Sequence, residues 1–528
     1  MKQIAAVIML VILATRASAS TLSNAFERQL SLEEAIAMSL EHNEGIVIQR
    51  ETLAAAEAAE LGAHGAYDPD LGAYADYNHT QTPVNSPLSG APAGRAAPTY
   101  EAGTGGVSVR QLLPTGGSVA VRMDASRQTT DGTFVLLSPA YQTRAGIEFR
   151  QPLLRGRSID SARLGLRVSA AFRAQSNASL RRQVTDTVAL VEQAYWSLVS
   201  ALRTMVVRQE AVEWAQQQLE ETRSRVDGGA APKNEISQPT AELERRRGEL
   251  FASREDASRA ENALKRLILG AEDTGMWASR LVPADDPQVE MARVDVEDAL
   301  ARALAQRPEV DESKSEIERR RIEATFAQDT IKPGLDAYVS YDRFGLAGSV
   351  VDQDPNSQFQ VTIPHWIRGG LGSSLDTLHD GRYDDTRAGV VLSIPIGNRF
   401  AKGAAGVAKS AERQAQAGLS GLQKQIMAEV LDATAAVDTA AQRVEAARAA
   451  REAADVQWTS ERDRYGVGLS TNFLVLTRQN DLSRARLDEI TALTDYRKAR
   501  TEIARATGAL LDERHIKVES TPPTREEN

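Results

Sequence analysis

Residues 184–205 read VTDTVALVEQAYWSLVSALRTM, and their large apolar side chains recur alternately every four and three positions. This spacing is typical of a helix that packs along one seam against other helices, as in a coiled coil. No Pro interrupts residues 154–227, and a helix of that length with a rise of ~1.5 Å per residue would extend about 110 Å. The stretch therefore predicts an extended helical bundle rather than an ordinary globular core. The seam consists of Val184, Val188, Val191, Tyr195, Leu198, Leu202 and Met205.

The chain contains an internal repeat, and its second copy carries a second seam. Leu32-Glu33-Glu34-Ala35-Ile36 recurs as Val296-Glu297-Asp298-Ala299-Leu300, at an offset of 264. Thr143-Arg144-Ala145-Gly146 recurs as Thr386-Arg387-Ala388-Gly389, at an offset of 243. The drop from 264 to 243 means that repeat one carries 21 extra residues, which is enough for one additional β-hairpin. The second seam consists of Leu419, Leu422, Ile426, Val430, Ala433, Val437, Ala440, Val444 and Ala447.

The first 19 residues are typical of a cleavable secretory signal, because Lys2 is followed by an apolar run over residues 4–14 and then by Ala17-Ser18-Ala19. That run is shorter than the ~20 apolar residues of a membrane-spanning helix. The 528 residues contain no Cys, which excludes disulfides, Cys metal sites and a lipid attached to an N-terminal Cys. The net charge of −10 argues against nucleic acid as a partner.

Two segments alternate with the period of a β-strand. Val119, Val121 and Met123 alternate with Ser118, Arg122 and Asp124, and the segment around Ile147 behaves in the same way. Charges on one face suit a wet lumen and apolar side chains on the other suit lipid, as in a membrane β-barrel. A half-buried sheet in a soluble domain shows the same alternation, so the strands alone leave both interpretations open.

The repeat and the Gly- and Pro-containing stretches between its elements divide the chain into four predicted parts. A signal peptide occupies residues 1–19, and a polar disordered tail occupies residues 514–528. The first repeat spans residues 20–290, with strands at about 68–152 and a helical hairpin at about 154–270 whose tip lies near 228–232. The second repeat spans residues 291–513, with strands at about 333–396 and a helical hairpin at about 401–511 whose tip lies near 466–471.

No arrangement of residues predicts an enzyme or a cofactor site. The six His residues show no paired spacing with Cys, Asp or Glu that would suit a metal. The Gly-rich stretches at residues 103–106 and 368–372 lack the Lys-Ser/Thr of a phosphate-binding loop. No Ser stands in a nucleophile-elbow sequence, and Asp and Glu fall on helices with Arg three or four positions away. We therefore expect no catalytic residues, no cofactor and no metal.

From about Leu30 to Leu511 the chain resembles the outer-membrane efflux protein family, the TolC-like outer-membrane factors. The resemblance rests on the order of elements, the duplication, Gln151-Pro152-Leu153-Leu154 at the exit from the strands and Tyr465-Gly466-Val467-Gly468-Leu469-Ser470-Thr471. It implies an α+β membrane protein that forms a homotrimer, in which a shared β-barrel in the outer membrane continues into a long periplasmic α-helical barrel. The extra hairpin departs from the minimal pattern of the family and leaves the number of strands per subunit open.

The resemblance also implies a function and partners. The expected function is the exit duct of a tripartite efflux or type I secretion system, a passive conduit that is opened by a periplasmic adaptor (membrane fusion) protein and an inner-membrane pump. The expected location is the outer membrane, in contact with its lipid and extending into the periplasm. The alternative from another class is a soluble periplasmic coiled-coil scaffold whose short strands form an interaction domain.

The resemblance places candidate site residues at and after the two tips. Val467, Gly468, Leu469, Ser470 and Thr471 match the family's adaptor-contact motif, and Leu474 and Thr477 occupy positions where some relatives narrow the channel with acidic side chains. The first tip departs from that motif and is a weaker candidate. In both tips Gly also suits a helix C-terminus that needs a positive φ, and Leu474 also suits a packing position. The first tip consists of Gly228, Gly229, Ala230 and Ala231.

Overall fold

The computed structural model describes residues 27–85, 90–230, 232–287, 291, 293–352 and 361–518. The predicted signal peptide lies outside these residues. The chain forms two compact units. The helical unit contains the chain up to Ala55 together with Ala174–Lys314 and the chain from Ala417 onward, and the sheet unit contains Ala56–Arg173 and Ser315–Gln416.

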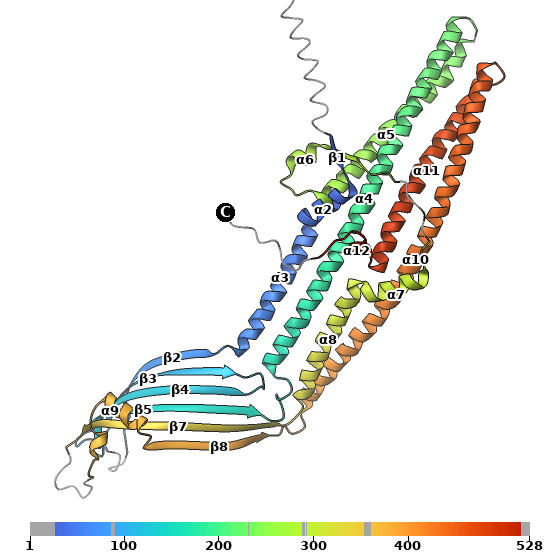
Figure 1. The fold of residues 1–528 in the computed structure, drawn as a ribbon. Coiled ribbons are helices and arrows are strands. Elements are labelled where there is room, and N and C mark those ends of the chain that lie inside the picture. The colour runs from blue at the N-terminus through green and yellow to red at the C-terminus, as the bar shows by residue number, and fades with distance from the viewer. Residues whose placement is uncertain are drawn as a thin grey trace, which may run out of the picture. The chain divides into compact units, whose positions relative to one another are not determined.

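The first repeat runs from a short strand through two helices, four strands and a long helical hairpin (Figure 1). Its elements are β1 (Glu27–Leu30), α2 (Leu32–His42), α3 (Glu44–His64), η1 (Gly65–Tyr67), β2 (Asp70–Gln81), β3 (Thr99–Leu112), β4 (Ser118–Thr130), β5 (Leu137–Pro152), α4 (Ser161–Asp227), η3 (Lys233–Ile236) and α5 (Ser237–Ile268).

The second repeat follows the same order with two strands in place of four. Its elements are α6 (Thr274–Ala278), β6 (Arg280–Pro283), α7 (Val296–Gln306), α8 (Pro308–Asp329), β7 (Gly334–Val350), η4 (His365–Ile367), α9 (Leu371–His379), β8 (Tyr383–Ser393), α10 (Arg399–Gly466), α11 (Asn472–Thr507) and α12 (Leu510–Glu513). The additional hairpin that the 21 extra residues predict is therefore present in repeat one.

The long helices follow the predicted seams. Helix α4 has 67 residues and α10 has 68, each without a break. Val188, Val191 and Tyr195 of the first seam are fully buried, as is Val430 of the second seam. The hydrophobic core around the first seam, which we call the first core, is rich in Leu and aromatic residues. The hydrophobic core around the second seam is rich in Ala and Val. The seams predicted from the alternating spacing are thus confirmed.

The junctions between consecutive short helices differ between the repeats. Asn43, which lies between α2 and α3, accepts hydrogen bonds from the backbone N–H groups of Gly45 (3.0 Å) and Ile46 (3.3 Å). The matching position between α7 and α8 is Arg307, which is buried and donates to Glu309 (2.6 Å) and Glu429 (2.5 Å). One junction is therefore an uncharged cap and the other is a buried ion cluster.

Burial alone would raise the pKa of Glu309 and Glu429, but hydrogen bonds outweigh it. Each carboxylate accepts from the Arg307 guanidinium, and this holds the pKa of both Glu residues below the ordinary value. Burial likewise opposes the charge of Arg307, yet its bonds to the two carboxylates raise the pKa of the guanidinium. All three groups are therefore charged at neutral pH.

The sheet unit contains an antiparallel six-stranded sheet in the order β2-β3-β4-β5-β7-β8. Within each repeat, strands of this sheet that follow one another along the chain pair with each other. The β5–β7 pair joins the two repeats. Strand β5 ends at Pro152, and one further hydrogen bond follows it, from the Leu153 N–H to the Leu335 carbonyl of β7 at 2.7 Å. Strands β2 and β8 are left as the two edges of the sheet.

Two predictions need correction. The strand segment predicted at about 333–396 also contains η4 and α9, which lie between β7 and β8. The tail predicted to be disordered from residue 514 is ordered over residues 514–518, because Arg514 donates to the buried carboxylate of Glu192 (2.6 Å) and Ile516 and Val518 pack against the first core. The remainder of the predicted tail lies outside the described residues.

Candidate functional site

The sheet has two chemically different faces, which follow from the alternation along each strand. We call the face that carries Val121 and Ile147 the apolar face. Across the sheet Val121 pairs with Val109 on one side and with Ile147 on the other, so apolar side chains form continuous rows. These side chains remain exposed, Val121 at 47% and Val390 at 67%. The exposed members of the face are Leu71, Tyr77, Val107, Val109, Val121, Met123, Ile147, Phe149, Val339, Val390 and Leu392.

The opposite, polar face holds an ion cluster around one buried carboxylate at its centre. Asp342 of β7 is 1% exposed and accepts two hydrogen bonds from Arg144, Nε–Oδ1 at 3.0 Å and Nη2–Oδ2 at 3.0 Å. Arg122, one strand further away, donates to Asp342 Oδ1 at 3.3 Å. A Cβ at Gly146 would lie 1.9 Å from Asp342 Oδ1, so only Gly allows the cluster to lie flat across β5. The charged side chains are therefore paired with one another on the sheet.

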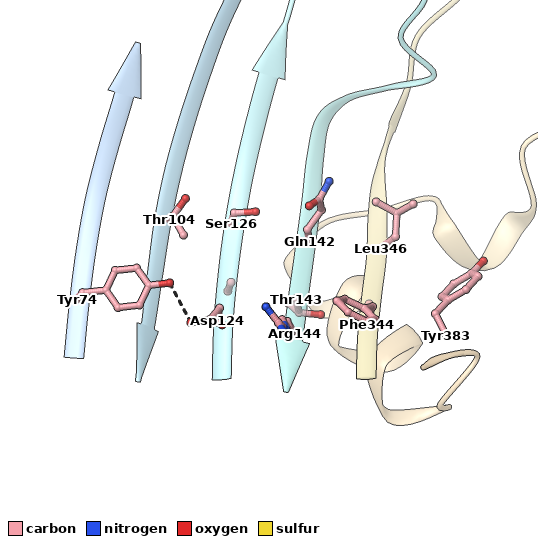
Figure 2. Close-up of a pocket in the computed structure, with 12 residues that line it drawn as sticks. Tyr74, Thr104, Asp124, Ser126, Gln142, Thr143, Arg144, Phe344, Leu346 and Tyr383 are labelled. Carbon is pink, nitrogen blue, oxygen red and sulfur yellow. Dashed lines mark hydrogen bonds between the residues drawn. The ribbon is translucent and has the colours of Figure 1, made fainter. Parts of the chain in front are cut away.

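A hydrogen bond between a tyrosine and a carboxylate lies on the same face, and Figure 2 shows it together with Arg144. Tyr74 of β2 reaches across β3, and its hydroxyl donates to Asp124 Oδ1 at 2.9 Å. A Cβ at Gly106 would lie 2.7 Å from the Tyr74 ring, so Gly again makes room for a flat side chain. Tyr74, Asp124 and Arg144 line a hollow of about 510 Å³, whose lining also includes Gln142 and Phe344. The polar face is thus concave and suited to contact with water.

The two helix tips have the same backbone conformation. After α4, the N–H of Ala230 donates to the Arg225 carbonyl at 2.8 Å, and Gly229 has a φ of +73°. After α10, the N–H of Leu469 donates to the Arg464 carbonyl at 2.8 Å, and Gly468 has a φ of +76°. These are helix ends closed by a left-handed residue, a conformation that favours Gly. The prediction of a positive φ at both tips is confirmed.

The side chains of the two tips differ. The second tip exposes Val467 (72%), Leu469 (71%) and Phe473 (64%). Ser470 donates to Glu461, and Thr471 is the N-cap of α11, where its side chain accepts from the Leu474 N–H. Phe473 was not predicted, although an exposed aromatic residue in the first turn after a tip is a signal that sequence reasoning could use.

The first tip offers only small side chains. Gly228, Gly229 and Ala230 are exposed, and Ala231 lies outside the described residues. The tip continues through Pro232 into η3. It therefore shares the geometry of the second tip without presenting an apolar surface of comparable size.

Contacts join the two long hairpins within the helical unit. Near the tips, Arg225 of α4 donates to the Tyr465 hydroxyl of α10 at 2.7 Å. Further along, Trp214 and Trp458 stack with ring centroids 5.5 Å apart, and Arg486 pairs with Glu210 at 2.9 Å. The turns of the two repeats are thus held side by side by polar and aromatic contacts.

The candidate constriction residues lie in the first turns of α11. Leu474 is 41% exposed, while the neighbouring Val475 and Leu476 are buried. Within one chain, packing is therefore carried by the latter two residues and not by Leu474. Thr477 donates to the Phe473 carbonyl at 2.8 Å and lines a groove between α5 and α11. Both positions remain predictions for a constriction.

The described residues contain no group of three or more His, Cys, Asp or Glu that could hold a metal ion. Among the helices that the structure describes, none is both long enough and apolar enough to cross a membrane.

Comparison with known proteins identifies relatives. Residues 299–509 match the model of a family described as outer membrane efflux protein. A search of curated proteins finds no match. The CmeC outer membrane channel of Campylobacter jejuni is similar in structure, with a TM-score of 0.62 and 15% identity over 91% of this chain and 86% of that chain.

Two further solved structures show the same likeness. The outer membrane protein VceC of Vibrio cholerae has a TM-score of 0.59 and 17% identity, over 90% of this chain and 96% of that chain. The open state of the MtrE outer membrane channel of Neisseria gonorrhoeae has a TM-score of 0.58 and 16% identity, over 91% of this chain and 89% of that chain. The predicted combination of long helices and an antiparallel sheet is therefore confirmed as the fold of these channels.

Proposed function

We infer that this chain, which belongs to the outer membrane efflux protein family, is the outer-membrane channel of an efflux or secretion system. The family consists of channels rather than enzymes, as predicted. The observation that carries the inference is the sheet, which combines an exposed apolar face with a polar face on which the buried Asp342 is paired with two Arg side chains. A soluble sheet would cover its apolar face, whereas lipid satisfies it as it stands. This favours the channel over the soluble scaffold.

The number of strands supports an assembly of several copies. About eight strands are needed to close even a filled barrel, and one chain supplies six. The edges β2 and β8 run in opposite directions, because each neighbouring pair in the sheet is antiparallel. Strand β8 of one copy can therefore pair with β2 of the next and continue the antiparallel ladder. Closure also removes unpaired edges from lipid.

A homotrimer with six strands per chain forms an eighteen-stranded barrel. With strands ~4.8 Å apart and tilted by about 40°, such a barrel has a backbone radius of roughly 18 Å. The polar face lines its lumen and the apolar face meets lipid. Because Gly146 and Gly106 let charged and aromatic side chains lie flat, the wall occupies little of the lumen. The extra hairpin of repeat one thus widens the duct.

The helices carry the duct into the periplasm, and the tips meet the partners. The proposed adaptor contact is the second tip, Val467–Thr471, extended by Phe473, because this is where apolar side chains are exposed. Energy for transport comes from the inner-membrane pump, since the sequence contains no nucleotide-binding motif. The chain itself acts as a passive conduit.

The absence of Cys makes the assembly testable by disulfide mapping. Ala75→Cys on β2 is combined with single Cys substitutions scanned along β8, and oxidised membranes are separated on non-reducing gels. We expect covalent dimers and trimers at one register of the scan. The control replaces Ala75→Cys with Ala125→Cys on the interior strand β4 and gives no cross-link.

A simpler measurement tests the location. A detergent-resistant oligomer in the outer-membrane fraction supports the channel. Release of the chain as a soluble protein by osmotic shock would instead favour the periplasmic scaffold. Capture of the adaptor through a photoreactive residue at Leu469 tests the tip, and failure to capture a hairpin-bearing periplasmic protein contradicts that assignment.

A further inference from the structure

A short helix, α9, lies directly on the apolar face of the sheet, against β5 and β7 (Figure 1). The Thr143 hydroxyl donates to the Ser374 carbonyl at 3.1 Å. The Thr377 hydroxyl, whose shorter bond is to the Ser373 carbonyl of its own helix at 2.8 Å, also lies 3.3 Å from the Leu346 carbonyl oxygen of β7. A Cβ at Gly345 would lie 2.0 Å from the Ser374 carbonyl oxygen, so Gly permits the helix backbone to rest on the strand. The contact is therefore close and hydrogen-bonded.

The distribution of side chains on α9 differs from that of an ordinary surface helix in water. The side that faces the sheet carries Ser374 and Thr377, which are 0% and 2% exposed, together with one Leu, Leu378, which is 8% exposed. The other two Leu side chains, Leu371 and Leu375, are 43% and 36% exposed. A helix on a water-soluble protein turns its large apolar side chains toward the core. Small polar residues at the packing interface with large apolar residues outside are typical of helices that pack in lipid.

The exposed surface of α9 is itself divided. At 100° per residue, Leu371 and Leu375 occupy one flank and Asp376 and Asp380 occupy the other. Beside them the indole of Trp366 is 39% exposed, and the guanidinium of Arg382 lies 5.1 Å from its ring centroid. A helix with one apolar and one charged flank, next to an exposed Trp, fits the boundary between acyl chains and headgroups.

The position of α9 along the strands agrees with this boundary. It contacts the start of β5 and the end of β7, the ends remote from α4 and α8, which join the same strands at their other ends. In the proposed orientation this is the outer leaflet. Because β5 and β7 lie inside the sheet and not at its edges, barrel closure between copies leaves the Leu flank facing lipid.

We propose that α9 and Trp366 form a membrane-interface anchor on the outside of the barrel, with the Leu371–Leu375 flank in the acyl chains of the outer leaflet. This proposal rests on the proposed function, because it requires the apolar face to meet lipid. The anchor fixes the depth of the barrel at its extracellular end. Its ligand is a lipid bilayer and not a protein partner.

Spin labelling tests the proposal in the full chain, which has no Cys of its own. Nitroxides are attached to Leu375→Cys and to Asp376→Cys in proteoliposomes, and power saturation compares accessibility to oxygen and to a water-soluble nickel chelate. We expect the Leu375 label to favour oxygen and the adjacent Asp376 label to favour nickel. A Leu375 label as accessible to nickel as a label at Val456 of α10, which is 69% exposed in the helical unit, overturns the anchor.

A label at Val121→Cys separates the two levels of inference. If Val121 favours oxygen while Leu375 favours nickel, only the anchor is wrong. If Val121 itself favours nickel, the apolar face does not meet lipid and the proposed function fails as well.

Fluorescence provides an independent readout that does not depend on labelling. The chain has five Trp residues, and brominated acyl chains quench only those in lipid. We expect Trp366→Phe to remove most of the quenchable fraction, whereas Trp277→Phe, which removes an equally exposed Trp of the helical unit, leaves it unchanged. An unchanged quenchable fraction in Trp366→Phe overturns the anchor.

Discussion

The turn after α4 and the turn after α10 are built on the same hydrogen bonds but present different surfaces. Gly229 and Gly468 occupy equivalent positions with φ values of +73° and +76°. Around Gly468 stand Val467 and Leu469, whereas around Gly229 stand Gly228 and Ala230. The backbone of such a turn depends on one residue that tolerates a positive φ, so its neighbours are free to change. A duplicated fold can in this way keep its architecture and give the two copies different contacts.

The helix junctions likewise occupy the same place in both repeats but carry different side chains. Asn43 and Arg307 follow helices that both begin at a side-chain cap, Ser31 in one repeat and Asp295 in the other. The first junction is a neutral cap, and the second is a buried Arg with two carboxylates. The two junctions should therefore respond very differently to mutation and to pH.

The largest expected effect is at this second junction. Arg307→Ala removes the buried cation that Glu309 and Glu429 share. It should lower the free energy of unfolding by about 3 kcal/mol, the low end for a buried pair, because Glu429 is 30% exposed and lies 3.9 Å from Arg505. Asn43→Ala removes only a cap and should cost about 1 kcal/mol. Urea unfolding followed by helical circular dichroism at fixed protein concentration measures both. Equal losses at the two junctions would break the comparison.

The two junctions should also differ in their response to acid. The pKa of Glu309 and of Glu429 is lower in the folded chain than in the unfolded chain. Their stabilisation is therefore complete above the ordinary Glu pKa and is lost as the pH falls through the folded values. We expect the urea midpoint to decrease on acidification, and to decrease less steeply in Arg307→Met. An identical slope in the variant would show that other groups cause the acid sensitivity.

Exchanging the tips tests whether side chains alone distinguish them. Val467→Gly with Leu469→Ala gives the second tip the residues of the first, and we expect at least a tenfold loss of adaptor capture, or about 1.4 kcal/mol. The reciprocal change, Gly228→Val with Ala230→Leu, serves as the matched variant and should increase capture at the first tip. Unchanged capture in the first variant would remove Val467 and Leu469 from the proposed contact.

Replacing the two tip glycines tests the shared backbone. Gly229→Ala and Gly468→Ala each force a Cβ into a left-handed conformation, which should cost about 1–2 kcal/mol at either tip. Hydrogen exchange of the last helical turns reports the loss locally. Costs that differ by more than measurement error would mean that the turns are not equivalent.

The smallest expected effect concerns Leu474, whose side chain is 41% exposed in the single chain. If it narrows the entrance by excluding water, Leu474→Ser should raise single-channel conductance or open probability. Thr477→Val is the control, because it changes the neighbouring candidate position while keeping its volume. No change in either quantity for Leu474→Ser would count against an apolar gate.

Much of the fold follows from the spacing of the apolar residues and from the Gly and Pro residues that end helices and strands. The four-three spacing predicted the buried seams at Val188 and Val430, and Gly predicted the turns. Helix α9 was not predicted, because two of its three Leu residues face outward and its Gly-rich approach is typical of a loop. The ordered contact of Arg514 was also not predicted, since its partner Glu192 is 322 residues away.

The sequence by itself determined the duplication, the long helices, the two turns and the extra hairpin of repeat one. Each of these depends on residues close together along the chain, where helical and strand periods and a positive φ leave a local mark. Only the tertiary structure decided which strands are neighbours, how the Asp342 cluster forms and where α9 packs on the sheet. Asp342 lies 198 residues from Arg144 and 220 residues from Arg122, and no local pattern records such a pairing. The ion cluster of the polar face and the position of α9 arise from such distant contacts.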